Sequence, residues 1–224
     1  MIDKVLIDLD GTLLDFSKGE KKAFIETIKK FTGYTPDDFE CQKFSIINEF
    51  YFNEYRNKKM DRDTFHFNRF KEIYEYLKLN ANILESDTYY VNALKYNAEI
   101  YDDVLDGIKY LAKKYDLYVV SNGMTEVQRK RTELAGLSKY FKKYYISEEC
   151  GANKPDIEFF DYVFNDINDF DKSHYIIIGD RLDTDVLGGI NAGIKTIYLA
   201  RKEIYSDIKP DYEIQSLKEI NNIL

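Results

Sequence analysis

The second half of the chain alternates between short apolar segments and amphipathic stretches of about ten residues, and this alternation constrains the fold more than any other feature. It predicts strands at residues 117–120, 144–146, 175–178 and 196–199, and helices at residues 104–115, 126–135, 157–164, 185–192 and after Ser216. Apolar strands joined by helices require right-handed crossovers, which build a parallel sheet covered on both faces. The sequence therefore predicts an α/β fold with a doubly wound, Rossmann-like parallel sheet.

An earlier apolar segment at residues 4–9 predicts one further strand, buried on both faces. Residues 17–99 are typical of helices, because apolar side chains such as Ala23, Phe24, Ile28 and Phe31 recur at helical spacing. A strand followed by so long a helical stretch indicates an insertion. We therefore expect a discontinuous α/β core at residues 1–14 and 101–224, interrupted by an α-helical insert at residues 15–100.

Composition excludes several classes of partner. The 224 residues include 40 acidic and 32 basic side chains, for a formal net charge of −8. This balance argues against a nucleic-acid polymer or an anionic membrane as partner, and no apolar run approaches the roughly 18 residues of a membrane helix. The start of the chain leaves no room for a secretory signal, so we expect a cytoplasmic protein. No sequence feature sets its oligomeric state.

The first predicted strand runs into Asp8-Leu9-Asp10-Gly11-Thr12. Ligands of parallel sheets bind beyond the carboxyl ends of the strands, where Asp8 and Asp10 would share one side of an extended segment. Two carboxylates held together repel each other unless a cation or a proton intervenes. A hard divalent ion with oxygen ligands, most simply Mg²⁺, would remove that repulsion. A turn in which Asp-Gly serves only as a cap is the competing interpretation.

Three later strands end in further polar residues. These are Ser121-Asn122-Gly123, Lys154-Pro155, and Gly179-Asp180 followed by Asp185. A hydroxyl before a helix N-terminus suits an anionic oxygen, yet each of these segments alone also fits a helix cap or a solvated side chain. All four segments in order, each at a predicted strand end, indicate one site.

In this order the segments resemble the four motifs of the haloacid dehalogenase superfamily. The resemblance implies that Asp8 is the nucleophile and Asp10 the general acid/base of a phosphatase. It implies a phosphate-binding set of Thr12, Ser121, Asn122 and Lys154. It also implies a Mg²⁺ site formed by Asp8, the backbone carbonyl of Asp10, Asp180 and, directly or through water, Asp185.

The implied reaction is hydrolysis of a small-molecule phosphate monoester through an aspartyl-phosphate. A halide leaves without a proton, so haloacid dehalogenases typically lack the second aspartate, and Asp10 favours phosphoryl transfer. Four alternatives stay open. They are a small-metabolite phosphatase acting on a sugar phosphate or phosphoglycolate, a phosphomutase, a haloacid dehalogenase and a non-catalytic scaffold.

A closer resemblance concerns the substrate. The segments Thr125-Glu126-Val127-Gln128 to Arg131, Gly136-Leu137 to Tyr140-Phe141, Ile146 to Gly151 and Asp185 to Gly193 look like the bacterial pyrimidine 5′-nucleotidase branch. This resemblance implies hydrolysis of the nucleoside monophosphates UMP, dUMP and dTMP. The sequence departs from that branch in two places. Gly11 stands where the branch often has Glu, and the Trp that the branch carries in its cap is absent.

In this superfamily an α-helical cap domain, inserted after the first motif, closes over the site and selects the leaving group. The resemblance implies that residues 15–100 are this cap. Asn48 and the pair Arg69-Phe70 match the nucleotidase pattern loosely, and Phe16 lies just past the first motif. We therefore expect Phe16, Asn48 and Arg69 to contribute to substrate selection.

Overall fold

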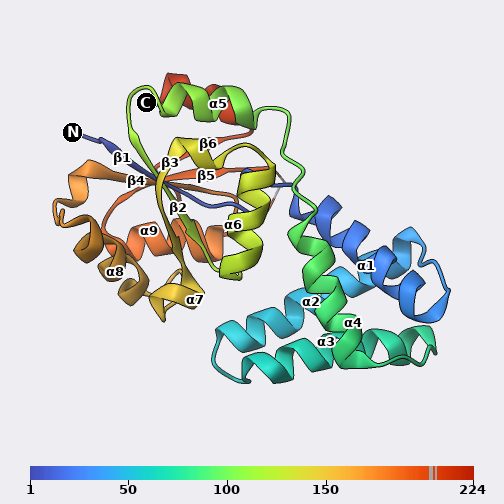
Figure 1. Cartoon of the computed structure of the whole chain (residues 1–224). Coiled ribbons are helices and arrows are strands. Elements are labelled where there is room, and N and C mark those ends of the chain that lie inside the picture. The colour runs from blue at the N-terminus through green and yellow to red at the C-terminus, as the bar shows by residue number, and fades with distance from the viewer. Residues whose placement is uncertain (202–203, 205) are drawn as a thin grey trace. The chain divides into compact units, whose positions relative to one another are not determined.

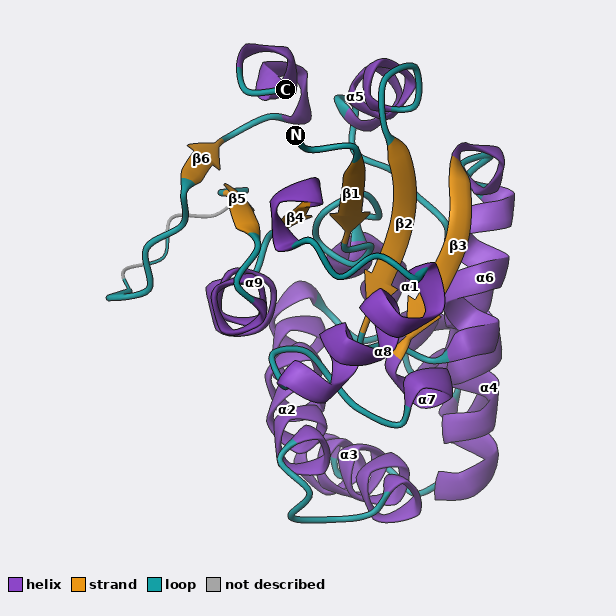
Figure 2. Cartoon of the chain, turned by 90° about the vertical axis from the view of Figure 1, so that its left-hand side faces the viewer, coloured by secondary structure: helices purple, strands orange, loops and turns teal. Residues whose placement is uncertain are grey.

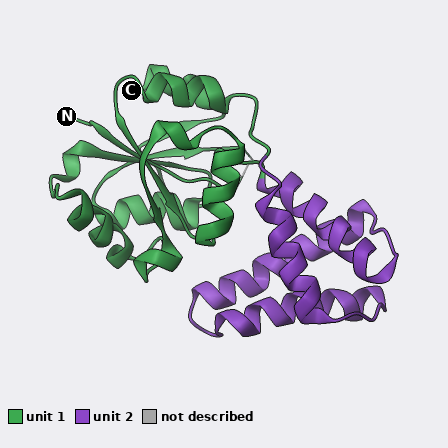
Figure 3. Ribbon diagram, viewed as in Figure 1, with its two compact units in different colours: residues 1–15, 99–224 green, residues 16–98 purple. Residues whose placement is uncertain are grey.

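The computed structural model describes residues 1–201, 204 and 206–224. These residues form two compact units, one of Met1–Asp15 with Glu99–Leu224 and one of Phe16–Ala98 (Figure 3). The chain enters the inserted unit one residue later, and leaves it two residues earlier, than the sequence predicts.

The larger unit is built on a six-stranded sheet with the order β3-β2-β1-β4-β5-β6 (Figures 1 and 2). The strands are β1 (Lys4–Ile7), β2 (Asp116–Ser121), β3 (Phe141–Ile146), β4 (Tyr175–Gly179), β5 (Lys195–Leu199) and β6 (Tyr212–Ile214). Each strand pairing in the described part of the chain is parallel, which confirms the predicted fold class. The short edge strand β6 was not predicted, because only Ile214 of its three residues is buried.

Both faces of the sheet are buried because successive strand residues point to opposite sides. Val5 and Ile7 pack on the side of α5 (Val104–Leu111), whereas Leu6 packs with Phe159 and Phe160 of α8 (Ile157–Ile167). The C-terminal 3₁₀ helix (Leu217–Asn222) lies beside α5, and α9 (Leu187–Ala192) lies on the side of α8 (Figure 1). The predicted cover on both faces is therefore present.

The remaining elements of this unit are α6 (Thr125–Leu134), α7 (Ser147–Cys150), two 3₁₀ turns (Ser138–Tyr140 and Lys172–His174) and a π-helical turn (Leu182–Val186). Three predicted helices differ from the structure. The closing helix predicted after Ser216 is a 3₁₀ helix. The helix predicted at residues 104–115 ends at Leu111. The N–H groups of Lys113 and Lys114 then donate to carbonyls three residues back, instead of the four of an α-helix. The helix predicted from Asp185 is preceded by the π-helical turn, which contains Asp185.

The inserted unit consists of the helices α1 (Phe16–Thr32), α2 (Asp38–Arg56), α3 (Arg62–Leu77) and α4 (Ile83–Lys95). Asp37 caps α2 and exchanges hydrogen bonds with Glu40 in a capping box. The core of this unit centres on Phe44, whose ring stacks on Phe24 with centroids 4.2 Å apart. The structure thus confirms an α-helical insert. No helix of the described residues has the length and apolar character needed to cross a bilayer.

Candidate active site

Three carboxylates gather at the carboxyl ends of β1 and β4. These strands are neighbours in the sheet, so Asp8, directly after β1, and Asp180, directly after β4, come together. The π-helical turn adds Asp185, and one oxygen from each of the three residues lies within 4.8 Å of the others. Oxygen donors at this spacing suit a hard divalent cation such as Mg²⁺.

Burial and charge repulsion together raise the pKa of two carboxylates in this cluster, Asp8 and Asp180. Burial raises the pKa of Asp8 well above its usual range, and nearby Lys154 offsets this only in part. Burial and the charge of Asp185 raise the pKa of Asp180 to about 7. A bound divalent cation would favour the ionised carboxylates and reverse these shifts. The residues present therefore fit the Mg²⁺ that the sequence motifs imply.

Lys154 enters the same cluster although it is distant in the sequence. Its side chain is 1% exposed, and its Nζ lies 2.7 Å from Asp8 Oδ1 and 2.6 Å from Asp185 Oδ1. Nζ also donates a hydrogen bond to the Val120 carbonyl at 2.8 Å. Burial opposes the charged form, but Asp185 and Asp8 outweigh it and hold the pKa of Lys154 above its ordinary value. A buried positive charge thus directly contacts the predicted nucleophile.

The loop after β1 is shaped to meet Asp180. The Thr12 hydroxyl lies 2.9 Å from Asp180 Oδ1 and 3.3 Å from Asp8 Oδ2. Gly11 has φ of +87°, and a Cβ at this position would lie 2.1 Å from Asp180 Oδ2. Both the backbone conformation and the space beside Asp180 therefore require glycine.

The two predicted phosphate-binding residues at the end of β2, Ser121 and Asn122, already have protein partners. Asn122 Nδ2 donates to the Lys154 carbonyl, and the Lys154 backbone N–H donates to Asn122 Oδ1, both at 2.8 Å. The Asn122 amide therefore holds the loop that carries Lys154. The Ser121 hydroxyl accepts hydrogen bonds from the Gly123 N–H at 3.2 Å and from Gln128 Nε2 at 2.9 Å. A phosphate contact by either residue stays a prediction.

The Asp10 carboxylate does not lie with that of Asp8, as the expectation of two carboxylates sharing one cation would require. It is not part of the three-residue cluster among the described residues, and instead contacts α6. Gln128 Nε2 donates to Asp10 Oδ2 at 2.6 Å, and Arg131 Nη1 pairs with Asp10 Oδ1. Donors on α6 thus contact both oxygens of the Asp10 carboxylate. Neither Gln128 nor Arg131 belongs to a strand-end motif that would indicate this contact, although a three-residue spacing places both on one face of a helix.

The predicted selectivity residues lie in the inserted unit. The Arg69 side chain is buried, with Nε donating to Asp87 Oδ1 at 2.8 Å and Nη1 to Asn48 Oδ1 at 2.9 Å. Asn48 Nδ2 in turn donates to buried Glu20 at 2.8 Å. These bonds give Asn48 and Arg69 a structural role within the helical unit. Phe16 is the first residue of α1 and is half-buried. Substrate contact by the three residues stays a prediction.

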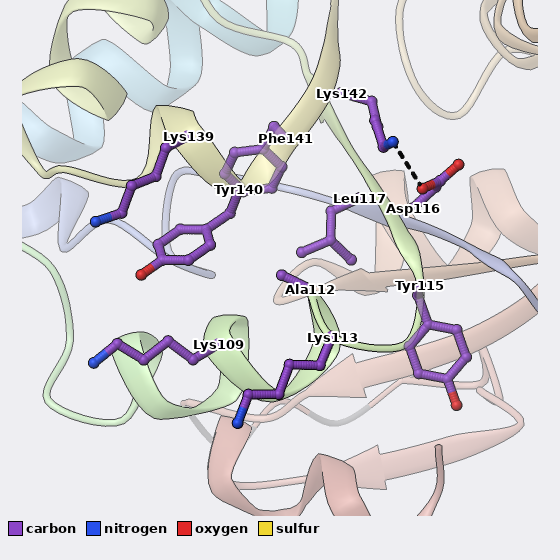
Figure 4. A pocket seen from close by; sticks show the side chains of 10 residues that line it. All are labelled: Lys109, Ala112, Lys113, Tyr115, Asp116, Leu117, Lys139, Tyr140, Phe141 and Lys142. Atoms are coloured by element: carbon purple, nitrogen blue, oxygen red, sulfur yellow. Dashed lines mark ion pairs between the residues drawn. The ribbon is translucent and has the colours of Figure 1, made fainter.

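One pocket of the larger unit, of about 640 Å³, lies away from these residues (Figure 4). It is lined by Lys109, Lys113, Lys139 and Lys142 among others, and Lys142 pairs with Asp116 at 3.3 Å. Its residues come from α5 and the segment after it, the start of β2, the 3₁₀ turn Ser138–Tyr140 and the start of β3, at the amino ends of the strands. The pocket is therefore at the opposite edge of the sheet from the carboxylate cluster.

Comparison with known proteins gives the class of the molecule. A family model of haloacid dehalogenase-like hydrolases matches residues 5–199. The chain belongs to this hydrolase family.

Its relatives include named phosphatases. The chain is 33% identical to the HAD-hydrolase YfnB of Bacillus subtilis, with 98% of this chain and 94% of YfnB covered. It is 30% identical to the pyrimidine 5′-nucleotidase YjjG of Escherichia coli (99% and 97% covered) and 29% identical to the pyrimidine 5′-nucleotidase PynA of Streptococcus pneumoniae (98% and 94% covered). A crystal structure of magnesium-bound YfnB superposes with a TM-score of 0.91 at 32% identity, covering 100% of this chain and 98% of that one.

Proposed function

We propose that this protein is a Mg²⁺-dependent phosphatase that hydrolyses phosphate monoesters through an aspartyl-phosphate on Asp8. The observation that carries the proposal is the contact of Asp8 with a buried lysine inside a cluster of three carboxylates. An ion held by Asp8, Asp180, Asp185 and the backbone carbonyl of Asp10 would supply positive charge, which offsets the repulsion between a carboxylate and a phosphate dianion.

The first step is transfer of the phosphoryl group to the protein. An Asp8 carboxylate oxygen forms a bond to phosphorus while the bond from phosphorus to the leaving oxygen breaks. Lys154, together with donors at Thr12, Ser121 and Asn122, stabilises charge on the phosphoryl oxygens. The protonated Asp10 carboxyl group donates its proton to the leaving oxygen, so the product leaves as an alcohol.

The second step regenerates Asp8. The Asp10 carboxylate takes a proton from a water molecule whose oxygen bonds to phosphorus, and the bond from Asp8 to phosphorus breaks. Inorganic phosphate then leaves, Asp8 is again a carboxylate, and Asp10 is again protonated. The ion pair that Lys154 makes with Asp8 is available once more for the next substrate.

For the substrate, we propose pyrimidine nucleoside monophosphates such as UMP, dUMP and dTMP. Support comes from the resemblance of the α6 and α9 segments to the nucleotidase branch, and from the two named pyrimidine 5′-nucleotidases related over nearly the whole chain. A cytoplasmic location, where such nucleotides occur, remains part of the proposal.

Phosphate release from a panel of esters tests both levels of the proposal. With Mg²⁺ present, UMP, dUMP and dTMP should be hydrolysed faster than sugar phosphates and phosphoglycolate. Asp8→Asn should lower turnover on the order of 10³-fold or more, because the carboxylate nucleophile is lost. Asp183→Asn is the matched control, since Asp183 pairs with Arg181 in the same loop and lies outside the cluster.

The outcomes separate the alternatives. Faster release from sugar phosphates or phosphoglycolate would replace the nucleotidase assignment with a small-metabolite phosphatase. Isomerisation without phosphate release would indicate a phosphomutase, and halide release from a haloacid a dehalogenase. If the protein hydrolysed no ester with any of several divalent ions, the non-catalytic, phosphate-binding scaffold would be the remaining interpretation.

A further inference from the structure

We propose that Gln128 and Arg131 are positioning residues that hold the Asp10 carboxyl group in the orientation needed to protonate the leaving oxygen. The inference rests on the proposed phosphatase function and adds to it. Neither residue belongs to the four strand-end motifs, and both lie on α6, far from Asp10 in the sequence.

Each oxygen of the Asp10 carboxyl group has its own donor. Gln128 Nε2 lies 2.6 Å from Oδ2, and Arg131 Nη1 contacts Oδ1. Two donors on two different oxygens fix the plane of the carboxyl group. A single donor would restrict its rotation less. Arg131 Nη1 also lies 3.4 Å from Gln128 Oε1, so the two donors are linked to each other.

Arg131 and Asp10 differ strongly in how far their side chains are buried. The Arg131 side chain is 0% exposed, whereas the Asp10 side chain keeps 28% of its surface exposed. Removing a guanidinium group from water is costly unless its partner has good geometry, so a fully buried arginine on α6 needs a reason beyond packing. Arg131 contacts the Asp10 carboxyl group from the protein interior, so the exposed part of that group stays accessible to a substrate.

The neighbouring backbone leaves space for the same contact. A Cβ on Gly123 would lie 2.4 Å from Gln128 Nε2, so glycine at this position lets the Gln128 side chain pass to Asp10. The same Nε2 donates to Ser121 Oγ at 2.9 Å. Gln128 thus links the proposed general acid to a predicted phosphate-binding hydroxyl.

A positioning role makes a distinctive kinetic prediction. A ribose 5′-alkoxide needs a proton to leave, whereas a nitrophenolate leaves without one. The ratio kcat/KM reports the steps through phosphoryl transfer, where only the alkyl ester depends on Asp10 as an acid. Loss of positioning should therefore lower kcat/KM for an alkyl phosphate and spare kcat/KM for para-nitrophenyl phosphate.

The test compares Gln128→Leu, Arg131→Met and Arg131→Lys with Asp10→Asn, at saturating Mg²⁺. For UMP, or the best alkyl phosphate of the panel, Gln128→Leu and Arg131→Met should each lower kcat/KM by about tenfold or more. For para-nitrophenyl phosphate the change should stay within about twofold, as in Asp10→Asn, and Arg131→Lys should recover part of the loss. Arg129→Met is the control, because Arg129 lies on the same helix with an exposed ion pair to Glu149.

The remaining outcomes would overturn the inference. Equal losses on both substrates would show a structural role, and unchanged kcat/KM for the alkyl ester would show none. If Gln128→Leu lowered activity further by its full factor in an Asp10→Asn background, it would act through another group. Should Arg131→Met fail to fold, Gln128→Leu and Arg131→Lys decide the question. A wild-type protein that hydrolyses neither ester would instead overturn the proposed function, and this inference with it.

Discussion

At the scale of single residues, the site depends on Gly11, a position where only glycine fits. Gly11 combines a left-handed backbone conformation with a close approach to Asp180. Gly136 has a similar φ of +68°, but a Cβ at Gly136 would have no neighbouring atom within 4 Å. The two glycines therefore separate backbone strain from steric conflict.

We expect Gly11→Ala to lower kcat/KM at least about tenfold, because the new methyl group must displace the Asp180 carboxylate. Gly136→Ala should cost only the backbone strain, about 1 kcal/mol of unfolding free energy, with kcat/KM unchanged. Steady-state kinetics and urea unfolding of both variants provide the measurement. Equal activity of the two variants would contradict the steric argument.

At the scale of elements, Asp103 joins three segments of the larger unit directly, and a fourth through Arg201. Lying just before α5, it pairs with Arg201 at 3.0 Å and accepts the Leu217 N–H of the C-terminal 3₁₀ helix at 2.6 Å. Arg201 Nη2 also donates to the Thr12 carbonyl at 2.8 Å. Contacts outside the cluster thus hold the loop that positions Thr12 beside Asp180.

Asp103→Asn should destabilise the protein in a pH-dependent way. Burial alone would raise the pKa of Asp103, but hydrogen bonds from Arg201 and Leu217 outweigh it and lower that pKa below its ordinary value. A lowered pKa in the folded state stabilises the protein above the unfolded pKa of roughly 4, and this stabilisation is lost as the pH falls through the folded value.

Urea unfolding of the Asp103→Asn variant at pH 7 should therefore show a loss of about 1–3 kcal/mol. The loss should shrink as the pH falls below the unfolded pKa of roughly 4 and towards the lower folded pKa, because folding then no longer favours the ionised carboxylate. Asp102→Asn, a change at the exposed neighbouring residue, should have no comparable effect. A loss that stays constant with pH would contradict the assigned ionic contribution.

At the scale of the whole molecule, the carboxylate cluster belongs to one of two compact units. Asp8, Asp180 and Asp185 all lie in the discontinuous unit, which the chain leaves after Asp15 and re-enters at Glu99. A ligand of the cluster therefore stabilises that unit directly. An inserted unit with its own aromatic core need not respond to the same extent.

Hydrogen exchange measures this difference. Mg²⁺ at about 100 times its Kd should add up to about 2.7 kcal/mol of protection to amides of β1 and β4 that exchange through unfolding of the larger unit. Amides of α2 and α3 should change less. Asp180→Asn should weaken the effect in the strands, because one carboxylate ligand is removed. Equal protection of the helices and the strands would contradict a site confined to the larger unit.

Much of the fold was accessible from the sequence because it follows from local periodicity. Buried strands such as Lys4–Ile7 and Tyr175–Gly179 are short apolar runs. In the helices between the strands, apolar side chains recur at helical spacing. The exceptions are weakly patterned: β6 has one buried residue, and the π-helical turn at Leu182–Val186 has no distinctive composition.

By itself, the sequence determined which residues end the strands, and parallel topology then placed Asp8, Lys154, Asp180 and Asp185 at one edge of the sheet. Tertiary structure alone decided their partners. It turned the Asp10 carboxylate to Arg131, 121 residues away, and it enclosed Arg69 in a buried network with Asn48 and Asp87. Local periodicity predicts which face of an element is buried, but a hydrogen bond between distant side chains depends on how the elements pack.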